Sequence, residues 1–180
     1  MTPVLETERL LLRVPALDDL DRWAEMMADP IAAKFIGGVQ PKTVVWRIVM
    51  QTVGAWHAAG SSMFSVVEKA SGNWIGRVGP WQPLGWPGTE VGWGLHPDAW
   101  GKGFAFEAAV ASTEFAFDTL GWSEVVHCIN PSNTPSQKVA KRLGARILRK
   151  ATLPAPLDYE HVDVWGQTRD EWRANRSAGD

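Results

Sequence analysis

The sequence has a single cysteine, Cys128, among its 180 residues, which excludes an intramolecular disulfide. A zinc site built on several cysteines is disfavoured for the same reason, and we expect no metal. A lone cysteine fits a reducing compartment, so we expect a cytoplasmic protein. No apolar run approaches the ~20 residues that a membrane span requires. The first residues carry neither the basic leader nor the apolar segment of a secretory signal.

The chain also has almost no net charge. The formal charge of −2 predicts no electrostatic attraction to a nucleic acid or a membrane, and we expect neither as a partner. The chain length suits one domain, and 45% apolar residues suffice for a substantial core. We therefore expect one domain over residues 1–180, with a frayed tail at 173–180. A monomer and a homodimer both remain open.

Tyrosine is nearly absent, with Tyr159 alone, whereas tryptophan occurs eleven times. The residues between the central tryptophans do not recur, so their near-regular spacing indicates no internal repeat. We expect core packing for most of them. A loop rich in proline and glycine at 83–88 contains Trp86 and follows closely after Trp81, and we expect this loop and the two tryptophans to border the entrance for the amine.

Hydrophobic periodicity and turn residues predict the order β-α-α-β-β-β-α-β-α-β-β. Thr43 is the predicted N-cap of the second helix, which Gly60 ends. Helices interspersed with hairpins favour a mixed sheet covered on both faces, an α/β (α+β) architecture. The predicted strands span residues 10–13, 63–67, 74–78, 89–95, 124–129, 146–152 and 159–167, and the predicted helices span 20–28, 43–60, 103–120 and 135–143.

The strongest local motif is HPDAWGKGFAFEA at residues 96–108. A strand ends, glycines permit unusual backbone angles, and a helix begins at once. Backbone N–H groups then converge at the positive end of a helix dipole, which suits an anion such as a pyrophosphate. A plain glycine-rich turn that caps a helix explains the spacing equally well. The third glycine of a dinucleotide fingerprint and the Gly-Lys-Ser/Thr of a P-loop are both lacking.

The segment WGKGFA at residues 100–105 resembles the Gln/Arg-x-x-Gly-x-Gly/Ala motif of the GNAT acetyltransferases, with Trp100 in place of Gln or Arg. Further segments resemble the RimJ/RimL-like branch, which includes ribosomal-protein N-terminal acetyltransferases. The resemblance runs from about residue 5 to residue 172, in the family's order. Its further segments are LETERLLLR at 5–13, IGRVG at 75–79, EVGWGL at 90–95, NTPS at 133–136 and VAKRLGA at 139–145.

This resemblance implies a GNAT fold, with a mostly antiparallel sheet splayed between its fourth and fifth strands. It implies acetyl transfer from acetyl-CoA to a primary amine, either a protein N-terminal α-amine or a small molecule. It also implies residues that hold the coenzyme along the strand, at the phosphate turn and before the late helix: Trp93, Gly94, Leu95, Gly101, Lys102, Gly103, Phe104, Ala105 and Asn133.

Glu90 is the best candidate for a general base. Alternation along a strand places Glu90, Gly92 and Gly94 on one face, where the glycines leave room for a ligand. The glycines could instead mark a bulge that re-aims Trp93. The alternative for Glu90 is a solvated strand carboxylate.

The departing thiolate needs a proton, and many family members supply it from a tyrosine on the late helix. Tyr159 lies outside that helix, but Ser136 stands where the RimJ/RimL-like branch carries a serine, so the resemblance implies that Ser136 takes this role. Ser136 could equally be a first-turn helix residue, and Asn133 a cap. His161 and Asp163 alternate along the last strand, and we predict them at the acceptor pocket.

Direct transfer in a ternary complex is expected, because Cys128 shows no activation as a nucleophile. The amine must be neutral to attack, which favours an α-amine with a pKa of ~8 over a lysine at ~10.4. The competing hypothesis is a non-catalytic acyl-CoA-binding domain. Such a domain would keep the phosphate turn without depending on Glu90 or Ser136.

Overall fold

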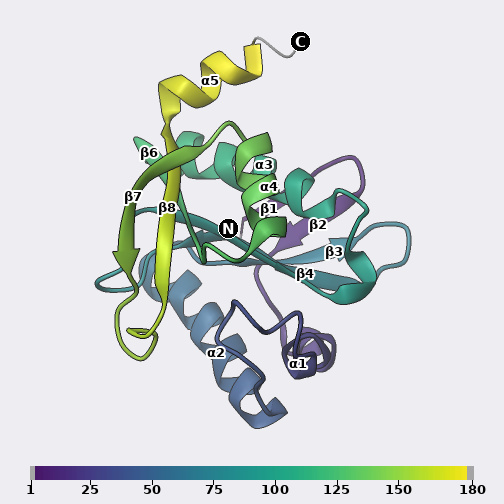
Figure 1. The fold of residues 1–180 in the computed structure, drawn as a ribbon. Coiled ribbons are helices and arrows are strands. Elements are labelled where there is room, and N and C mark those ends of the chain that lie inside the picture. The colour runs from purple at the N-terminus through teal and green to yellow at the C-terminus, as the bar shows by residue number, and fades with distance from the viewer. Residues whose placement is uncertain (1–2, 178–180) are drawn as a thin grey trace.

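The computed structural model describes residues 3–177, and all eight of their strands lie in one sheet (Figure 1). The strand order is β1-β2-β3-β4-β5-β6-β8-β7, and every neighbouring pair is antiparallel except β5 with β6. The strands are β1 Val4–Glu6, β2 Leu10–Arg13, β3 Phe64–Glu68, β4 Trp74–Trp81, β5 Glu90–Leu95, β6 Glu124–Ile129, β7 Arg146–Thr152 and β8 His161–Thr168.

Helices cover the two faces of this sheet, with α1 and α2 on one side and α3 and α4 on the other (Figure 1). This arrangement confirms the mixed, mostly antiparallel sheet that the sequence predicts. The helices are α1 Leu20–Ala28, α2 Lys42–Ala59, α3 Phe104–Asp118, α4 Thr134–Arg142 and α5 Arg169–Ser177, with 3-10 turns η1 at Leu17–Asp19 and η2 at Pro97–Ala99.

The sheet is splayed between β5 and β6. These parallel strands are paired at one position only, Glu90 with Val126. Counted from β2, they are the fourth and fifth strands, as predicted. The opening beyond Glu90 leaves the rest of β5 without a neighbouring strand on that side, although β4 pairs with β5 along its full length.

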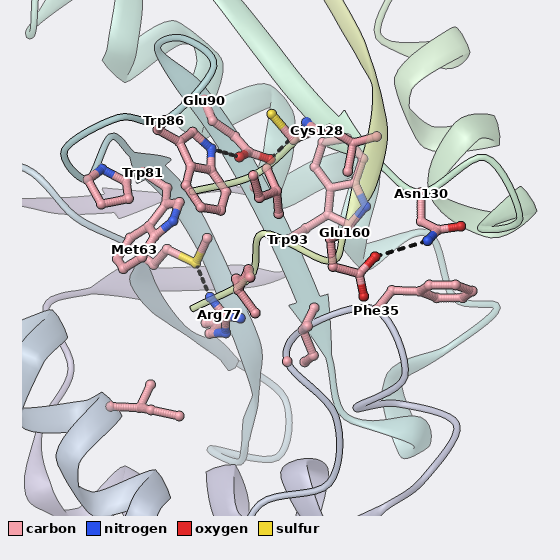
Figure 2. Close-up of a pocket in the computed structure, with 18 of the residues that line it drawn as sticks. Phe35, Met63, Arg77, Trp81, Trp86, Glu90, Trp93, Cys128, Asn130 and Glu160 are labelled. Carbon is pink, nitrogen blue, oxygen red and sulfur yellow. Dashed lines mark hydrogen bonds between the residues drawn. The ribbon is translucent and has the colours of Figure 1, made fainter. Parts of the chain in front are cut away.

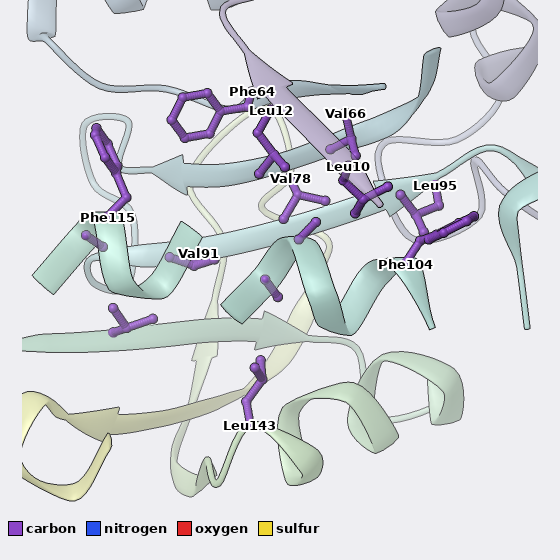
Figure 3. Close-up of a cluster of buried hydrophobic side chains, with 14 of the residues drawn as sticks. Leu10, Leu12, Phe64, Val66, Val78, Val91, Leu95, Phe104, Phe115 and Leu143 are labelled. Atoms are coloured by element: carbon purple, nitrogen blue, oxygen red, sulfur yellow. The ribbon is translucent and has the colours of Figure 1, made fainter. Parts of the chain in front are cut away.

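The larger core lies between α3 and strands β2 to β5 (Figure 3). Alternate strand residues such as Leu10 and Leu12 are fully buried there, because successive side chains of a strand point to opposite faces. Small residues of α3, including Ala108, Ala109 and Ala116, let the helix approach the sheet closely.

The second core lies under α1 and α2. Trp23 of α1 is fully buried and stacks on Trp74 of β4, with ring centroids 5.3 Å apart. Aromatic contacts of this kind contribute ~0.5–1.5 kcal/mol beyond their buried area. Five of the eleven tryptophans are buried in this way across the two faces: Trp23, Trp56, Trp74, Trp165 and Trp172.

Two predictions about the elements are wrong. Pro41, not Thr43, is the N-cap of α2, which begins at Lys42. Residues 173–177 belong to α5 rather than to a frayed tail, and residues 178–180 lie outside the described part of the chain. Helix α5 is anchored to α3, because Trp172 packs against Phe117 with ring centroids 6.3 Å apart.

Candidate active site

A cavity of about 470 Å³ begins on the α1–α2 face and reaches through the opening between β5 and β6 to α4 (Figure 2). Its wall is formed by α2 and the α1–α2 connection, by β4, β5 and β6, by the start of α4, and by the loops that follow β4 and β7. Six residues predicted for the site line it: Trp81, Trp86, Glu90, Trp93, Asn133 and Ser136.

Glu90 is only 7% exposed, at the position where β5 and β6 part. The Cys128 backbone N–H donates to Glu90 Oε1 over 3.0 Å, and the Trp86 indole N–H donates to Oε2. The β4–β5 register runs without a shift from Glu90 to Leu95, so the bulge alternative is excluded and Glu90 faces the cavity. A solvated strand carboxylate is likewise excluded.

Burial raises the pKa of Glu90 from 4.5 to about 7. The hydrogen bonds from Cys128 and Trp86 and the positive charge of Arg77 oppose this rise but do not cancel it. A carboxylate with a pKa near the working pH is well matched to accepting a proton and releasing it again. Glu90 therefore has the chemistry of a general base.

Ser136 lies in the first turn of α4, across the opening from β5. The Trp93 indole N–H donates to Ser136 Oγ over 3.1 Å. Ser136 Oγ acts as the acceptor in this bond, so its own proton remains available to another acceptor. The Ser136 backbone N–H donates to Asn133 Oδ1 over 3.2 Å, which shows that Asn133 is the N-cap of α4.

The predicted phosphate turn precedes α3 and lies outside the cavity lining. Gly101 and Gly103 have φ values of +73° and +81°, which L side chains rarely adopt. A Cβ at Gly101 would meet nothing within 4 Å, so the space in front of the turn is open. The Arg9 guanidinium donates to the Lys102 carbonyl over 2.9 Å, and its charge is paired with Glu107 of α3 at 2.6 Å. These features fit an anion at the positive end of a helix.

Two features of the protein fit acetyl-CoA, the coenzyme that the motifs imply. One is the open turn with its left-handed glycines. The other is the stretch of β5 that has no strand neighbour on the β6 side, where Trp93, Gly94 and Leu95 lie. An extended chain can add to such an edge through backbone hydrogen bonds. The residues present therefore fit the coenzyme.

His161 and Asp163, predicted at the acceptor pocket, do not line the cavity that contains Glu90. They do share one face of β8, but it is the face away from the cavity, where they line a separate shallow hollow with Lys150 and Thr152. Val162, the residue between them, lines the cavity and also borders this hollow. Strand alternation shows which residues share a face, but not which face borders the site.

The structure also brings residues to the cavity that the sequence did not suggest. Arg77 of β4 and Met63, just before β3, lie on one wall. Glu160, before β8, accepts a hydrogen bond from the Asn130 amide over 3.1 Å. An isolated arginine in the otherwise apolar segment Trp74–Trp81 was the available signal for Arg77.

Two residues beside Glu90 are poor catalysts. Burial raises the pKa of the Cys128 thiol, and the negative charge of Glu90 raises it further, so a thiolate is disfavoured. Burial lowers the pKa of His127 to about 4, which keeps the ring neutral. His127 Nδ1 lies 2.7 Å from the Val91 carbonyl oxygen.

Among residues 3–177, no three or more His, Cys, Asp or Glu side chains are grouped so that they could hold a metal ion. In the same range, no helix is both long and apolar enough to cross a bilayer.

Comparison with known proteins agrees with this geometry. Residues 9–146 match the family model described as an acetyltransferase (GNAT) domain. The uncharacterized N-acetyltransferase p20 of Bacillus licheniformis is 32% identical over 143 residues, which cover 77% of this chain and 80% of that protein.

Solved structures give the same result. An acetyltransferase from Agrobacterium tumefaciens str. C58 has a TM-score of 0.82 and 31% identity, and the match covers 93% of this chain and 95% of that one. A putative ribosomal-protein-serine acetyltransferase from Vibrio cholerae has a TM-score of 0.76 at 21% identity, covering 93% and 99% of the two chains, and shares the fold. The chain thus belongs to the GNAT family of acetyl-CoA-dependent acetyltransferases, as its motifs predict.

Proposed function

We propose that this protein acetylates a primary amine by direct attack of the amine on the thioester of acetyl-CoA, within a ternary complex. The observation that carries the proposal is Glu90, a buried carboxylate with a pKa of about 7 at the point where β5 and β6 part. A base placed there faces both the cavity and the open stretch of β5.

The amine attacks as the neutral species, and Glu90 accepts its proton directly or through a water molecule. The nitrogen–carbon bond forms as the carbon–sulfur bond breaks. Backbone N–H groups of β5 stabilise the negative charge that develops on the carbonyl oxygen. A positioned general base of this kind accelerates a reaction by ~10²–10⁴-fold.

Ser136 gives its hydroxyl proton to the departing sulfur and regains one from water. The hydrogen bond from Trp93 supports this role, because it fixes Ser136 Oγ as an acceptor and leaves the proton free. A thiol has a pKa of ~8.5, so the proton donor assists the reaction without being obligatory.

The backbones of Trp93, Gly94 and Leu95 and the side chain of Asn133 bind the pantetheine arm, and the turn at 101–105 binds the pyrophosphate. The open edge of β5 and the two left-handed glycines support this placement. A covalent acetyl-enzyme is disfavoured, because the thiol of Cys128 is held protonated.

Trp81 and Trp86 form the acceptor side of the cavity together with the 83–88 loop. Their rings meet edge to face, with centroids 6.2 Å apart, so they present one continuous apolar wall. The acceptor is a protein N-terminal α-amine or a small amine.

The test is an acceptor screen of short peptides and small amines, read out by release of free CoA thiol. Turnover should depend on the amine, and varying both substrates should give the intersecting pattern of a ternary complex. A parallel, ping-pong pattern would contradict direct attack. Binding of acetyl-CoA without turnover on any amine would favour the acyl-CoA-binding domain instead.

A further inference from the structure

Arg77 is a second charged group in the cavity, and it lacks an ionic partner. Its Nη1 donates to the Met63 thioether sulfur over 2.6 Å, and its buried Nε has no hydrogen-bond partner among the described residues. No carboxylate within residues 3–177 forms an ion pair with it. Figure 2 shows Arg77 beside Met63 and apart from Glu90.

This arrangement leaves a guanidinium poorly satisfied. A thioether is a weak acceptor, whereas a guanidinium carries five N–H donors in a planar fork. Burial lowers the pKa of Arg77 to about 10, so the group stays positively charged at neutral pH. Its Nε is buried without a partner in the part of the chain that the structure describes, and an unsatisfied buried donor is costly. Such a residue is expected to be paired when the site is filled.

The sheet positions Arg77 to meet a ligand. It lies on β4 directly opposite Gly94 of β5, where a Cβ would come within 4.0 Å of Arg77 Nε. The missing side chain at Gly94 gives the guanidinium room on the same face as Glu90. The side chain of Arg77 is only partly buried, and the residue lines the cavity.

We propose that the acceptor is a small amine that also carries a carboxylate, such as a free amino acid, and that Arg77 binds this carboxylate while the amine faces Glu90. This inference rests on the proposed function and names the substrate class of the same site. A guanidinium fork matches a carboxylate in a bidentate pair, which gives both strength and orientation. A cavity of about 470 Å³ is of the size that holds small molecules.

The experiment compares leucine, methionine and phenylalanine with the amide of each, which lacks the carboxylate charge. A tripeptide amide with a free N-terminus is included as a peptide acceptor. The wild type should prefer each acid over its amide by roughly 10- to 100-fold in kcat/KM, as expected for charge-assisted hydrogen bonds. In Arg77→Met this ratio should fall close to one, mainly through a higher KM for the acid. The KM for acetyl-CoA should not change.

Arg173→Met is the matched control, because Arg173 is 62% exposed on α5 and lies outside the cavity lining. It should keep the wild-type preference. If Arg77→Met does not fold, Arg77→Lys keeps the charge but removes the fork, and its preference for acids should be reduced. A structural role for Arg77 would change stability without changing the preference.

Equal turnover of acids and amides by the wild type would overturn the inference, as would a preference that survives in Arg77→Met. The tripeptide amide as the best acceptor would also overturn it, and would indicate a peptide N-terminus as substrate. In each of these cases the proposed acetylation of an amine would stand. Acetylation of none of these amines, nor of any other, would overturn both.

Discussion

Glu90 has an unusual environment for a strand carboxylate because three separate segments enclose it. β5 carries it, the loop before β5 brings the Trp86 indole over it, and β6 brings the Cys128 N–H. The enclosure removes water, which disfavours the charged form, while the two donors keep that form accessible. The balance gives a pKa of about 7.

Replacing Glu90 with glutamine should lower kcat by ~10²–10⁴-fold, because it removes the base while retaining the shape. In the wild type, kcat should rise with pH through a limb near pH 7, as the carboxylate loses its proton. This limb should be missing from Glu90→Gln. Steady-state kinetics from pH 5.5 to 9, with acetyl-CoA affinity measured by calorimetry, checks the prediction.

Glu124→Gln provides the control, since Glu124 is an exposed carboxylate on β6. It should leave both kcat and its pH limb in place. An effect of less than threefold for Glu90→Gln across this pH range, in a folded protein, would assign the proton transfer to another group.

Trp86 lines the cavity on the side that we propose for the acceptor, and it donates to Glu90. Trp86→Ala should therefore raise the acceptor KM several-fold and leave the acetyl-CoA KM alone, since the wall that it removes touches one substrate only. The measurement is steady-state kinetics with both substrates varied, alongside a melting curve.

Trp46→Ala is the matched control, because Trp46 is 47% exposed on α2 and outside the cavity lining. It should leave both KM values unchanged. If Trp86→Ala instead changes the melting temperature or the oligomeric state while acceptor kinetics stay constant, Trp86 is a structural residue.

The sequence predicted that a residue lines the cavity where that residue belongs to a family motif. Glu90, Asn133 and Ser136 belong to motif segments and do line the cavity. Arg77 belongs to such a segment too. The sequence could not show, however, that its guanidinium lacks an ionic partner among the described residues, because that depends on the residues that surround it in the fold. His161 and Asp163 do not line the cavity, because the period of a strand does not reveal which of its faces borders the site.

The turn between β5 and α3 can be tested by a substitution at Gly103. Gly103 has φ +81° and is the N-cap of α3. In Gly103→Glu a side chain and a negative charge enter the proposed pyrophosphate site, so acetyl-CoA binding measured by calorimetry should be lost or severely weakened. Turnover should fall with it.

A control must separate this effect from backbone strain, because any L residue at a positive φ is strained. Gly121, after α3, has φ +72° and open space around it. Gly121→Glu therefore carries the same strain and charge away from the turn, and should bind acetyl-CoA normally. Undiminished binding by a folded Gly103→Glu protein would place the pyrophosphate elsewhere.

Strongly periodic elements were predictable, and polar or short ones were not. The expected bounds of α1 match the observed Leu20–Ala28 because a buried stripe with clear stop residues defines them. Helix α5, by contrast, is polar over most of its length, and its one buried residue is Trp172. Strand β1 has three residues and exists only because β2 pairs with it. Tertiary contacts, rather than local pattern, make these two elements.

Burial shifts the pKa values of two groups beside the cavity in opposite directions. Burial raises the pKa of Glu90 to about 7 and lowers that of His127 to about 4. Between about pH 4.5 and 6.5, the folded protein binds more protons than the unfolded chain at Glu90, and fewer at His127. Glu90 therefore makes stability fall as pH rises, and His127 makes it rise. The two effects nearly cancel.

Glu90→Gln should expose the contribution of His127. The melting temperature of the wild type should change little between pH 4.5 and 6.5, whereas that of Glu90→Gln should increase steadily with pH. One uncompensated proton changes stability by ~1.4 kcal/mol per pH unit, which corresponds to a rise of ~3–6 °C per unit in a domain of this size. The lowered pKa values of Asp19, Glu107 and Glu171 act mainly below this window, and they affect both proteins alike. Calorimetric melting of both proteins in the same buffers measures the difference, and a parallel pair of curves would show that Glu90 is not protonated in the folded state at pH 5.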